Sequence, residues 1–279
     1  MTVLEVLQSM TAYFKKRNID NPRLNAEHLL AHVLGRTRME LYLEFEKNPG
    51  ETELATLREL VRRRGQGEPL QHLLGTVEFC GHTFLCDKRA MVPRPETEEL
   101  VELLLQSTIH HPPSNILDVG TGSGVIALSL AAKFPEAQIH AVDVSEEALA
   151  LARENAERLN LSGRVHFLES NLLRNIDGAF DLVVANLPYI SLQDRHLLSR
   201  EVLHDPEVAL FGGAHGDELI RELIEQAPPH LRLGGLLALE AGIGQAEALS
   251  DVLTQKKYDD ICSRNDYSGT IRFMFARYG

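Results

Sequence analysis

The sequence predicts an α/β protein with a mostly parallel sheet that ends in an antiparallel strand, preceded by a small helical domain and a β-hairpin. Three observations predict this fold. Short apolar runs alternate with helical patterns over residues 116–241. Two short strand-like runs between Tyr258 and Tyr278 flank Ser268-Gly269 without a helix between them, and strands joined by so tight a turn must be antiparallel. Residues 1–74 show only the apolar spacing of helices.

The expected organisation is a helical domain over residues 1–74, a β-hairpin linker over 75–90 and a larger domain over 91–279. In the first domain, apolar residues recur at helical spacing in four segments: Leu4–Phe14, Asn21–Gly35, Met39–Phe45 and Glu51–Arg64. His28 and His32 stand four residues apart on the second helix, but no third ligand is evident. No metal site is therefore expected.

The linker and the segment after it are extended. Residues 76–87 alternate in polarity and turn at Cys80-Gly81-His82, which predicts a hairpin. Pro93 and Pro95 then lock an extended stretch immediately before a helix whose first turn is acidic. Two interpretations of this stretch remain open: a rigid linker, or one wall of a cofactor pocket.

A glycine-rich turn follows the first strand of the larger domain. The apolar run 116–119 leads into Gly120-Thr121-Gly122-Ser123-Gly124, and residues 125–132 then form a helix. Glycines let the backbone turn tightly and approach a ligand closely. Asp143 closes the next strand, where a carboxylate can accept the two hydroxyls of a ribose. Together these signals predict a nucleoside cofactor.

The pattern favours S-adenosylmethionine over a dinucleotide. The turn reads G-x-G-x-G, and Val125 breaks the G-x-G-x-x-G pattern. Asp118 places a negative charge beside the turn, which would repel a pyrophosphate but suits an ammonium group. The cofactor residues expected are Asp118, Gly120, Thr121, Gly122, Ser123, Gly124, Asp143, Asn171 and Asn186.

Residues Asn186-Leu187-Pro188-Tyr189 end another buried strand and predict a clamp for a planar NH2 group. The Asn186 oxygen can accept one N–H and the Leu187 carbonyl the other, while the Tyr189 ring can lie against the flat substrate. Asn186, Leu187, Pro188 and Tyr189 are therefore the expected catalytic residues. Two groups fit such a clamp, a nucleobase amine and a side-chain amide.

The remaining elements complete the alternation. Ser145 caps a helix that runs to Leu159, and strands are expected over 164–169, 180–185 and 236–241, the last after a turn at Leu233-Gly234-Gly235. A parallel sheet that ends in an antiparallel strand is the class I (Rossmann-like) methyltransferase architecture.

Composition narrows the function. The net charge of −12 argues against a long polyanion as substrate, although a local basic patch would permit one. Three cysteines without metal spacing are typical of a reducing compartment. No apolar run is long enough to span a membrane, and the N-terminus lacks the core of a signal peptide. We expect a cytoplasmic protein without membrane contact.

The chain resembles the protein-(glutamine-N5) methyltransferases, the PrmC/HemK family. The resemblance extends over nearly the whole chain and rests on these motifs: Glu68-Pro69-Leu70, Gly75, Glu78-Phe79, Gly81, Phe84, Val92–Glu98, Asp118–Gly124, Glu207, Ala209–Gly213, Gly234-Gly235, Leu239-Glu240 and Asp266–Gly269. It implies methyl transfer from S-adenosyl-L-methionine to the glutamine of the Gly-Gly-Gln motif in peptide chain release factors. It also implies a monomer that needs no direct nucleic acid contact.

Two positions depart from the family pattern. Leu187 stands where the family usually has proline, and the Asn-Leu-Pro-Tyr form is similar to that of rRNA adenine dimethyltransferases. Asn171 replaces a residue that is often acidic in this fold. The alternatives left open are adenine-N6 methylation of RNA or DNA, and a release-factor-binding adaptor without activity.

Overall fold

The computed structural model describes residues 1–279, which divide into two compact units. The helical unit contains Met1–Thr76 together with Ser199–His204, a distant segment that the sequence did not assign to it. The sheet unit contains Val77–Leu198 and Asp205–Gly279. No helix in the chain combines the length and the apolar character that a membrane crossing requires.

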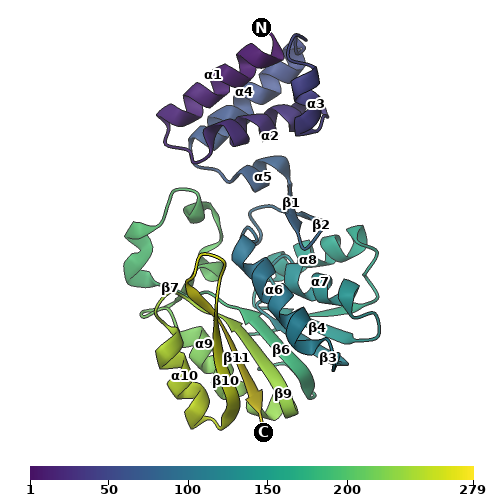
Figure 1. Cartoon of the computed structure of the whole chain (residues 1–279), viewed down its shortest axis with the longest axis vertical. Coiled ribbons are helices and arrows are strands. Elements are labelled where there is room, and N and C mark those ends of the chain that lie inside the picture. Colours follow the sequence, from purple (N-terminus) through teal and green to yellow (C-terminus); the bar gives the residue numbers. More distant parts are fainter. The chain divides into compact units, whose positions relative to one another are not determined.

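The helical unit consists of five helices, with α2 packed against both α1 and α4 (Figure 1). Their bounds are α1 (Val3–Lys16), α2 (Pro22–Leu34), α3 (Arg38–Leu43), α4 (Glu51–Gly65) and α5 (Leu70–Leu74). Phe14, Leu29 and Leu41 are fully buried in its core. The four expected helices are present, and α5 is a fifth short helix that apolar spacing alone did not separate.

A buried arginine connects three parts of the helical unit. Arg64, near the end of α4, donates to Asn25 Oδ1 at 2.6 Å and to the Glu68 carbonyl at 2.9 Å. Its guanidinium also pairs with Glu201 at 2.6 Å. This ion pair attaches the segment Ser199–His204 to the helices, and water has little access to Arg64, whose side chain is only 4% exposed.

The sheet unit begins with the predicted hairpin, β1 (Thr76–Phe79) and β2 (His82–Leu85), and continues into a seven-stranded sheet. The strand order is β10-β11-β9-β6-β3-β4-β5. The bounds of these strands are β3 (Asn115–Val119), β4 (Gln138–Asp143), β5 (Val165–Glu169), β6 (Phe180–Asn186), β9 (Leu231–Glu240), β10 (Tyr258–Asn265) and β11 (Ile271–Tyr278). The last strand, β11, runs antiparallel to both of its neighbours, which confirms the predicted architecture.

Helices cover both faces of this sheet. Successive side chains of a strand point to opposite faces, and here the apolar residues occupy both. Leu182 and Val184 of β6 join the core under α6 (Pro95–Thr108) and α7 (Val125–Lys133). Val183 of β6 joins the core under α9 (Glu218–Gln226) and α10 (Ala246–Gln255). A further helix, α8 (Glu146–Arg158), follows β4. The helices α9 and α10 were not assigned from the sequence.

One predicted turn is wrong. Leu233-Gly234-Gly235 does not precede the strand but lies inside β9, where the register against β6 shifts between the pairs Phe180–Leu231 and Leu182–Leu236. Gly234 has φ +77°, a value that glycine adopts freely, so the strand forms a bulge and continues. A glycine pair thus marks an irregularity within the strand and not its boundary.

The segment between β6 and α9 has little regular structure. It contains the short parallel pair β7 (Ile190–Ser191) and β8 (Phe211–Gly213). Between these strands lie the 3-10 helices η1 (Leu192–Leu197), η2 (Val202–His204) and η3 (Glu207–Ala209), and η4 (Pro228–His230) precedes β9. Part of this segment reaches the site described next.

Candidate active site

A cavity of about 300 Å³ opens at the carboxyl ends of β3, β4 and β6. This edge is where parallel α/β sheets bind their ligands. The predicted residues that line the cavity are Gly120, Thr121, Gly122, Ser123, Asp143, Asn171, Asn186, Leu187 and Pro188. The predicted residues that do not line it are Asp118, Gly124 and Tyr189.

The glycine turn owes its shape to positive φ angles. Gly120 and Gly124 have φ +74° and +83°. A Cβ at Gly120 would lie 2.8 Å from Leu187 Cδ2, so this glycine lets the turn contact the predicted clamp. A Cβ at Gly124 would lie 3.0 Å from Ala152 Cβ. Gly124 therefore serves the packing of the turn on α8, and the structure does not place it at the cavity wall as expected.

Asp118 lies beneath the turn and has no exposed surface. Its Oδ2 accepts hydrogen bonds from Thr121 Oγ1 at 2.6 Å and from the Ala127 amide at 3.1 Å, whereas Oδ1 has no partner. Burial raises the pKa of this carboxyl to about 7. The carboxyl therefore holds the turn from beneath, and its expected contact with a cationic ligand stays a prediction.

Asp143 reaches the cavity from the end of β4. Its two oxygens accept the amide hydrogens of Gly122 at 2.8 Å and of Ser145 at 2.9 Å. Burial raises its pKa against the effect of these hydrogen bonds. Each carboxylate oxygen has further acceptor capacity, so an oriented carboxylate faces the cavity and can accept hydroxyl groups.

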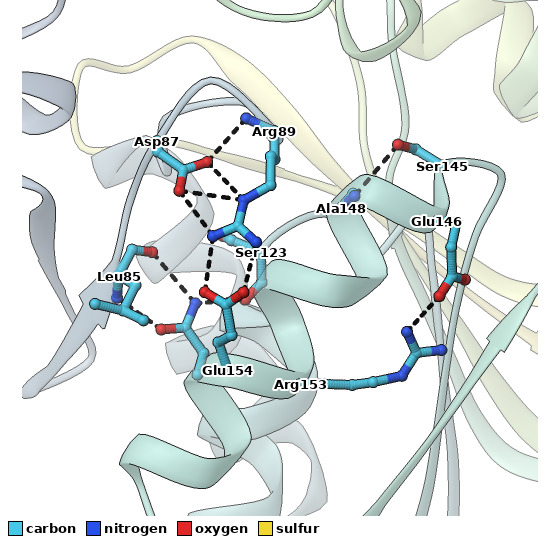
Figure 2. A network of polar contacts seen from close by, with 10 residues as sticks. Leu85, Asp87, Arg89, Ser123, Ser145, Glu146, Ala148, Arg153 and Glu154 are labelled. Carbon is cyan, nitrogen blue, oxygen red and sulfur yellow. Dashed lines mark hydrogen bonds and ion pairs between the residues drawn. The ribbon is translucent and has the colours of Figure 1, made fainter.

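The segment after the hairpin forms one wall of the cavity. Arg89 lies between Asp87 and Glu154 (Figure 2), with contacts of 2.8 Å and 2.6 Å to their carboxylates. These two ion pairs raise the pKa of Arg89 and fasten the segment to α8. The residues of this stretch that line the cavity are Arg89, Ala90, Met91 and Pro93. Of the two interpretations left open for the proline-containing stretch, the structure supports the wall.

Asn155 of α8 joins the hairpin to the glycine turn. Its Oδ1 accepts the Leu85 amide hydrogen at 2.6 Å, and its Nδ2 donates to the Leu85 carbonyl at 3.2 Å and to the Ser123 carbonyl at 2.9 Å. The side chain is completely buried. A single asparagine in a helix carries no sequence signal of this kind, so it was not predicted.

The clamp residues lie at the end of β6 and beyond it. Asn186 and Leu187 line the cavity, and Nδ2 of Asn186 donates to Thr97 Oγ1 at 2.9 Å. Tyr189 does not line the cavity, and its hydroxyl donates to Glu240 Oε1 at 3.3 Å. Thr97 Oγ1 in turn donates to Glu240 Oε2 at 2.8 Å. The expected packing of the Tyr189 ring against the substrate stays a prediction.

Glu240 stands at the centre of this network and is 1% exposed. Burial raises its pKa to about 7, and burial also raises the pKa of Tyr189. Neither Thr97 nor Glu240 was predicted as a site residue. Both lie in motifs that carried the family resemblance, and that was the only signal that could have found them.

Other cavity residues were also missed. Val144 and Leu172 follow β4 and β5, and Pro206, Val208 and Ala209 come from the irregular segment. Leu172 has φ +51°, which is unusual for leucine. A strained apolar residue in a loop has no pattern that sequence periodicity detects.

Two descriptions of known families match this chain. The PrmC N-terminal domain matches residues 5–75, and the methyltransferase small domain matches residues 97–214. A release factor glutamine methyltransferase of Geobacter sulfurreducens is 40% identical over 280 residues, with 100% of this chain and 97% of that protein covered. The chain belongs to the release factor glutamine methyltransferase family. The relative from Deinococcus radiodurans is 39% identical over 277 residues and covers 99% of both chains.

Among solved structures, the ribosomal protein L11 methylase of Lactobacillus delbrueckii subsp. bulgaricus superposes with a TM-score of 0.51 at 24% identity, covering 67% of this chain and 81% of that one. At this identity the likeness shows the fold alone. The assignment of this chain to the release factor glutamine methyltransferase family therefore depends on the full-length relatives. Its methyltransferase fold is supported by these relatives and by the solved structure.

Proposed function

We propose that this chain transfers a methyl group from S-adenosyl-L-methionine to N5 of the glutamine in the Gly-Gly-Gln motif of peptide chain release factors. The choice of glutamine is supported by the full-length relatives, and one observation supports a planar NH2 group as the methyl acceptor. The Asn186 amide nitrogen is already engaged by Thr97, so the carbonyl oxygen of Asn186 is the end of the amide left for a substrate N–H. An acceptor at this position suits a planar NH2 group.

The cavity fits the cofactor. Asp143 faces it with a carboxylate that two backbone amides orient, as recognition of ribose hydroxyls requires. Gly122 lacks a Cβ at the wall, which leaves room for a ligand close to the backbone. Val144, Asn171 and Leu172 also line the cavity and would hold the adenine. The cofactor supplies an electrophilic methyl group on a sulfonium.

The chain's own residues contribute positioning. An amide nitrogen is a weak nucleophile, so the reaction depends on holding it in line for transfer. The Asn186 oxygen would accept one N–H of the substrate amide and the Leu187 carbonyl the other. Leu187 is buried against Gly120, so packing can hold this backbone where the family usually has proline. The glutamine loses its proton to solvent, and no general base is required.

We assign recognition of the body of the release factor to the helical domain of residues 1–74. The Gly-Gly-Gln loop is small, and a separate helical unit in the same chain offers a second binding surface. A short Gly-Gly-Gln peptide should therefore have a much higher KM than the intact protein with the full chain, because the peptide loses this uniform binding. Equal KM values would exclude a role for the helical domain in recognition.

The decisive experiment is transfer of a labelled methyl group to purified release factor. We expect one label per release factor, lost when the motif glutamine is replaced by alanine. Ribosomal RNA serves as the second substrate, and labelled RNA would favour adenine methylation instead. Tight binding of release factor and cofactor without transfer would favour the adaptor. No transfer and no cofactor binding would overturn the proposal.

A further inference from the structure

We propose that Thr97 and Glu240 are positioning residues that determine which end of the Asn186 amide faces the substrate. The inference rests on the proposed function and assigns a role to two buried residues outside the clamp itself. Thr97 lies in the first turn of α6, and Glu240 ends β9. Three separate elements therefore meet at one hydrogen-bond chain.

The arrangement follows from the register of the sheet. Asn186 and Glu240 are register partners at the ends of the neighbouring parallel strands β6 and β9. The Thr97 hydroxyl links the two side chains, with 2.9 Å to Asn186 Nδ2 and 2.8 Å to Glu240 Oε2. The Thr97 and Glu240 side chains are shielded from solvent, since these residues are 3% and 1% exposed.

The hydrogen bonds from Asn186 to Thr97 and from Thr97 to Glu240 form a relay. The chemistry of these groups sets the direction in which each bond of the relay is donated. A threonine hydroxyl has a single hydrogen, and an ionised carboxylate can only accept. One oxygen of Glu240 therefore accepts a hydrogen bond from the Thr97 hydroxyl, and the other oxygen accepts one from the Tyr189 hydroxyl. The oxygen of Thr97 is then left as an acceptor toward Asn186. Only the NH2 end of the Asn186 amide can satisfy it.

The charges around Glu240 act in both directions. Burial has the largest effect and raises the pKa of Glu240, and the charge of Glu96 raises it further, whereas the hydrogen bond from Thr97 and the positive charge of Arg272 favour the ionised carboxylate. Arg272 is held in turn by Asp266, at 3.0 Å. Tyr189 donates a hydrogen bond that favours the charged form. In its ionised form, Glu240 holds the hydrogen bonds of Thr97 and Asn186 in the direction described.

The consequence concerns catalysis. An asparagine amide can face a substrate with its oxygen or with its NH2 group, and only the oxygen can accept a glutamine N–H. Because Thr97 binds the nitrogen before substrate arrives, the productive orientation is already selected. A site whose side chains are oriented by such a second layer loses no free energy to reorientation on binding.

The test compares Thr97→Val with Thr97→Ser. Valine keeps the shape of threonine and removes both hydrogen bonds, whereas serine keeps the hydroxyl. We expect Thr97→Val to lower kcat for release factor by about 100-fold, since loss of orientation in a site costs about this much. The dissociation constant for S-adenosylhomocysteine, measured by calorimetry, should change by less than about threefold. Thr97→Ser should recover kcat to within about threefold of wild type.

Thr108→Val is the matched control, because Thr108 is a buried threonine of the same helix whose hydroxyl donates to the Leu104 carbonyl of that helix. Its kcat should equal that of wild type. Should Thr97→Val not fold, as judged by circular dichroism, Glu240→Gln replaces it. That variant keeps the side-chain volume, but a glutamine amide can both donate and accept, so the direction of the relay is no longer defined. It should lower kcat without weakening the binding of S-adenosylhomocysteine.

Several outcomes would overturn the inference. Full kcat in Thr97→Val, or in Glu240→Gln, would show that the relay does not orient Asn186. Equal losses in Thr97→Val and Thr97→Ser would assign Thr97 a packing role only. Wild-type protein that methylates no release factor would overturn the proposed function and this inference together, whereas an active wild type with an equally active Thr97→Val overturns the inference alone.

Discussion

The guanidinium of Arg94 pairs with the carboxylate of Asp205, a side chain with no exposed surface. Asp205 also accepts the amide hydrogen of Val92 at 3.1 Å. It thereby connects the stretch that leads into α6, and so into Thr97, with the irregular segment whose next residue, Pro206, lines the cavity. Two walls of the site, far apart in sequence, depend on one carboxylate.

This pair predicts an asymmetric cost in stability. Arg94→Met leaves a buried charge at Asp205 without its guanidinium and should cost about 3 kcal/mol of unfolding free energy. Asp205→Asn keeps an acceptor for Val92 and leaves Arg94 partly exposed to water, so about 1 kcal/mol is expected. Urea unfolding of both variants measures the difference. Equal costs would show that the pair does not fix this carboxylate.

The clamp predicts a separation of chemistry from cofactor binding. Asn186→Ala should abolish methyl transfer, because the acceptor for the substrate amide is lost, while the affinity for S-adenosylhomocysteine stays within a few-fold of wild type. Turnover and calorimetric titration are the measurements. A variant that kept most of its turnover would show that Asn186 does not hold the substrate.

Position 187 tests whether packing replaces the usual proline. Leu187→Pro should retain activity, because the carbonyl acceptor remains and proline restrains the backbone. Gly120→Ala is the contrasting variant, since its new methyl group would lie 2.8 Å from Leu187 Cδ2 in a backbone conformation that alanine rarely adopts. We expect Gly120→Ala to lose activity. Comparable kcat in wild type and Gly120→Ala would contradict the contact.

The proposed contact between Asp143 and the ribose of the cofactor predicts how much affinity is lost when this carboxylate is replaced. Asp143→Ala should weaken cofactor binding by about 1–3 kcal/mol, since charge-assisted hydrogen bonds to hydroxyls are lost. Asp143→Asn should lose less, because an amide oxygen can still accept from one backbone amide. Calorimetry and the ligand-induced rise in Tm report both variants. Unchanged affinity in Asp143→Ala would place the cofactor elsewhere.

The ionisation of Glu240 predicts that the rate of methyl transfer decreases on the acid side of its pH profile. Its pKa is raised to about 7 by burial, and the relay requires the ionised form. Transfer to release factor should therefore be about half-maximal near pH 7 and become constant about one to two pH units above it. Because a raised carboxyl pKa means that the folded state holds the proton more tightly, this group's contribution to stability decreases as pH rises between its ordinary value of 4.5 and about 7.

Glu240→Gln provides the control for both effects. The variant should lose the limb near pH 7 in its kcat profile, and it should lose the corresponding decrease in unfolding free energy. A wild-type profile without a limb in this range would show that the ionisation of Glu240 does not control the relay.

The sequence by itself determined the fold class and the location of the site. Period-two and helical apolar patterns predicted the parallel sheet and four of the helices in the N-terminal unit, since burial of apolar side chains enforces these periods. The glycine turn, Asp143 and Asn186 were predicted because each follows directly on an apolar strand, and the ends of parallel strands meet at one edge of the sheet.

Only the tertiary structure decided what these residues contact. Gly124 was expected at the cofactor and packs on Ala152, and Asp118 was expected at a ligand and lies buried beneath the turn. Asn186 meets Glu240 through Thr97, which lies 89 positions away from Asn186. The local pattern of a chain determines which face of a strand or helix is buried. Hydrogen-bond partners distant in sequence are set by the register of the strands and the packing of the helices, so they appear only in the folded chain.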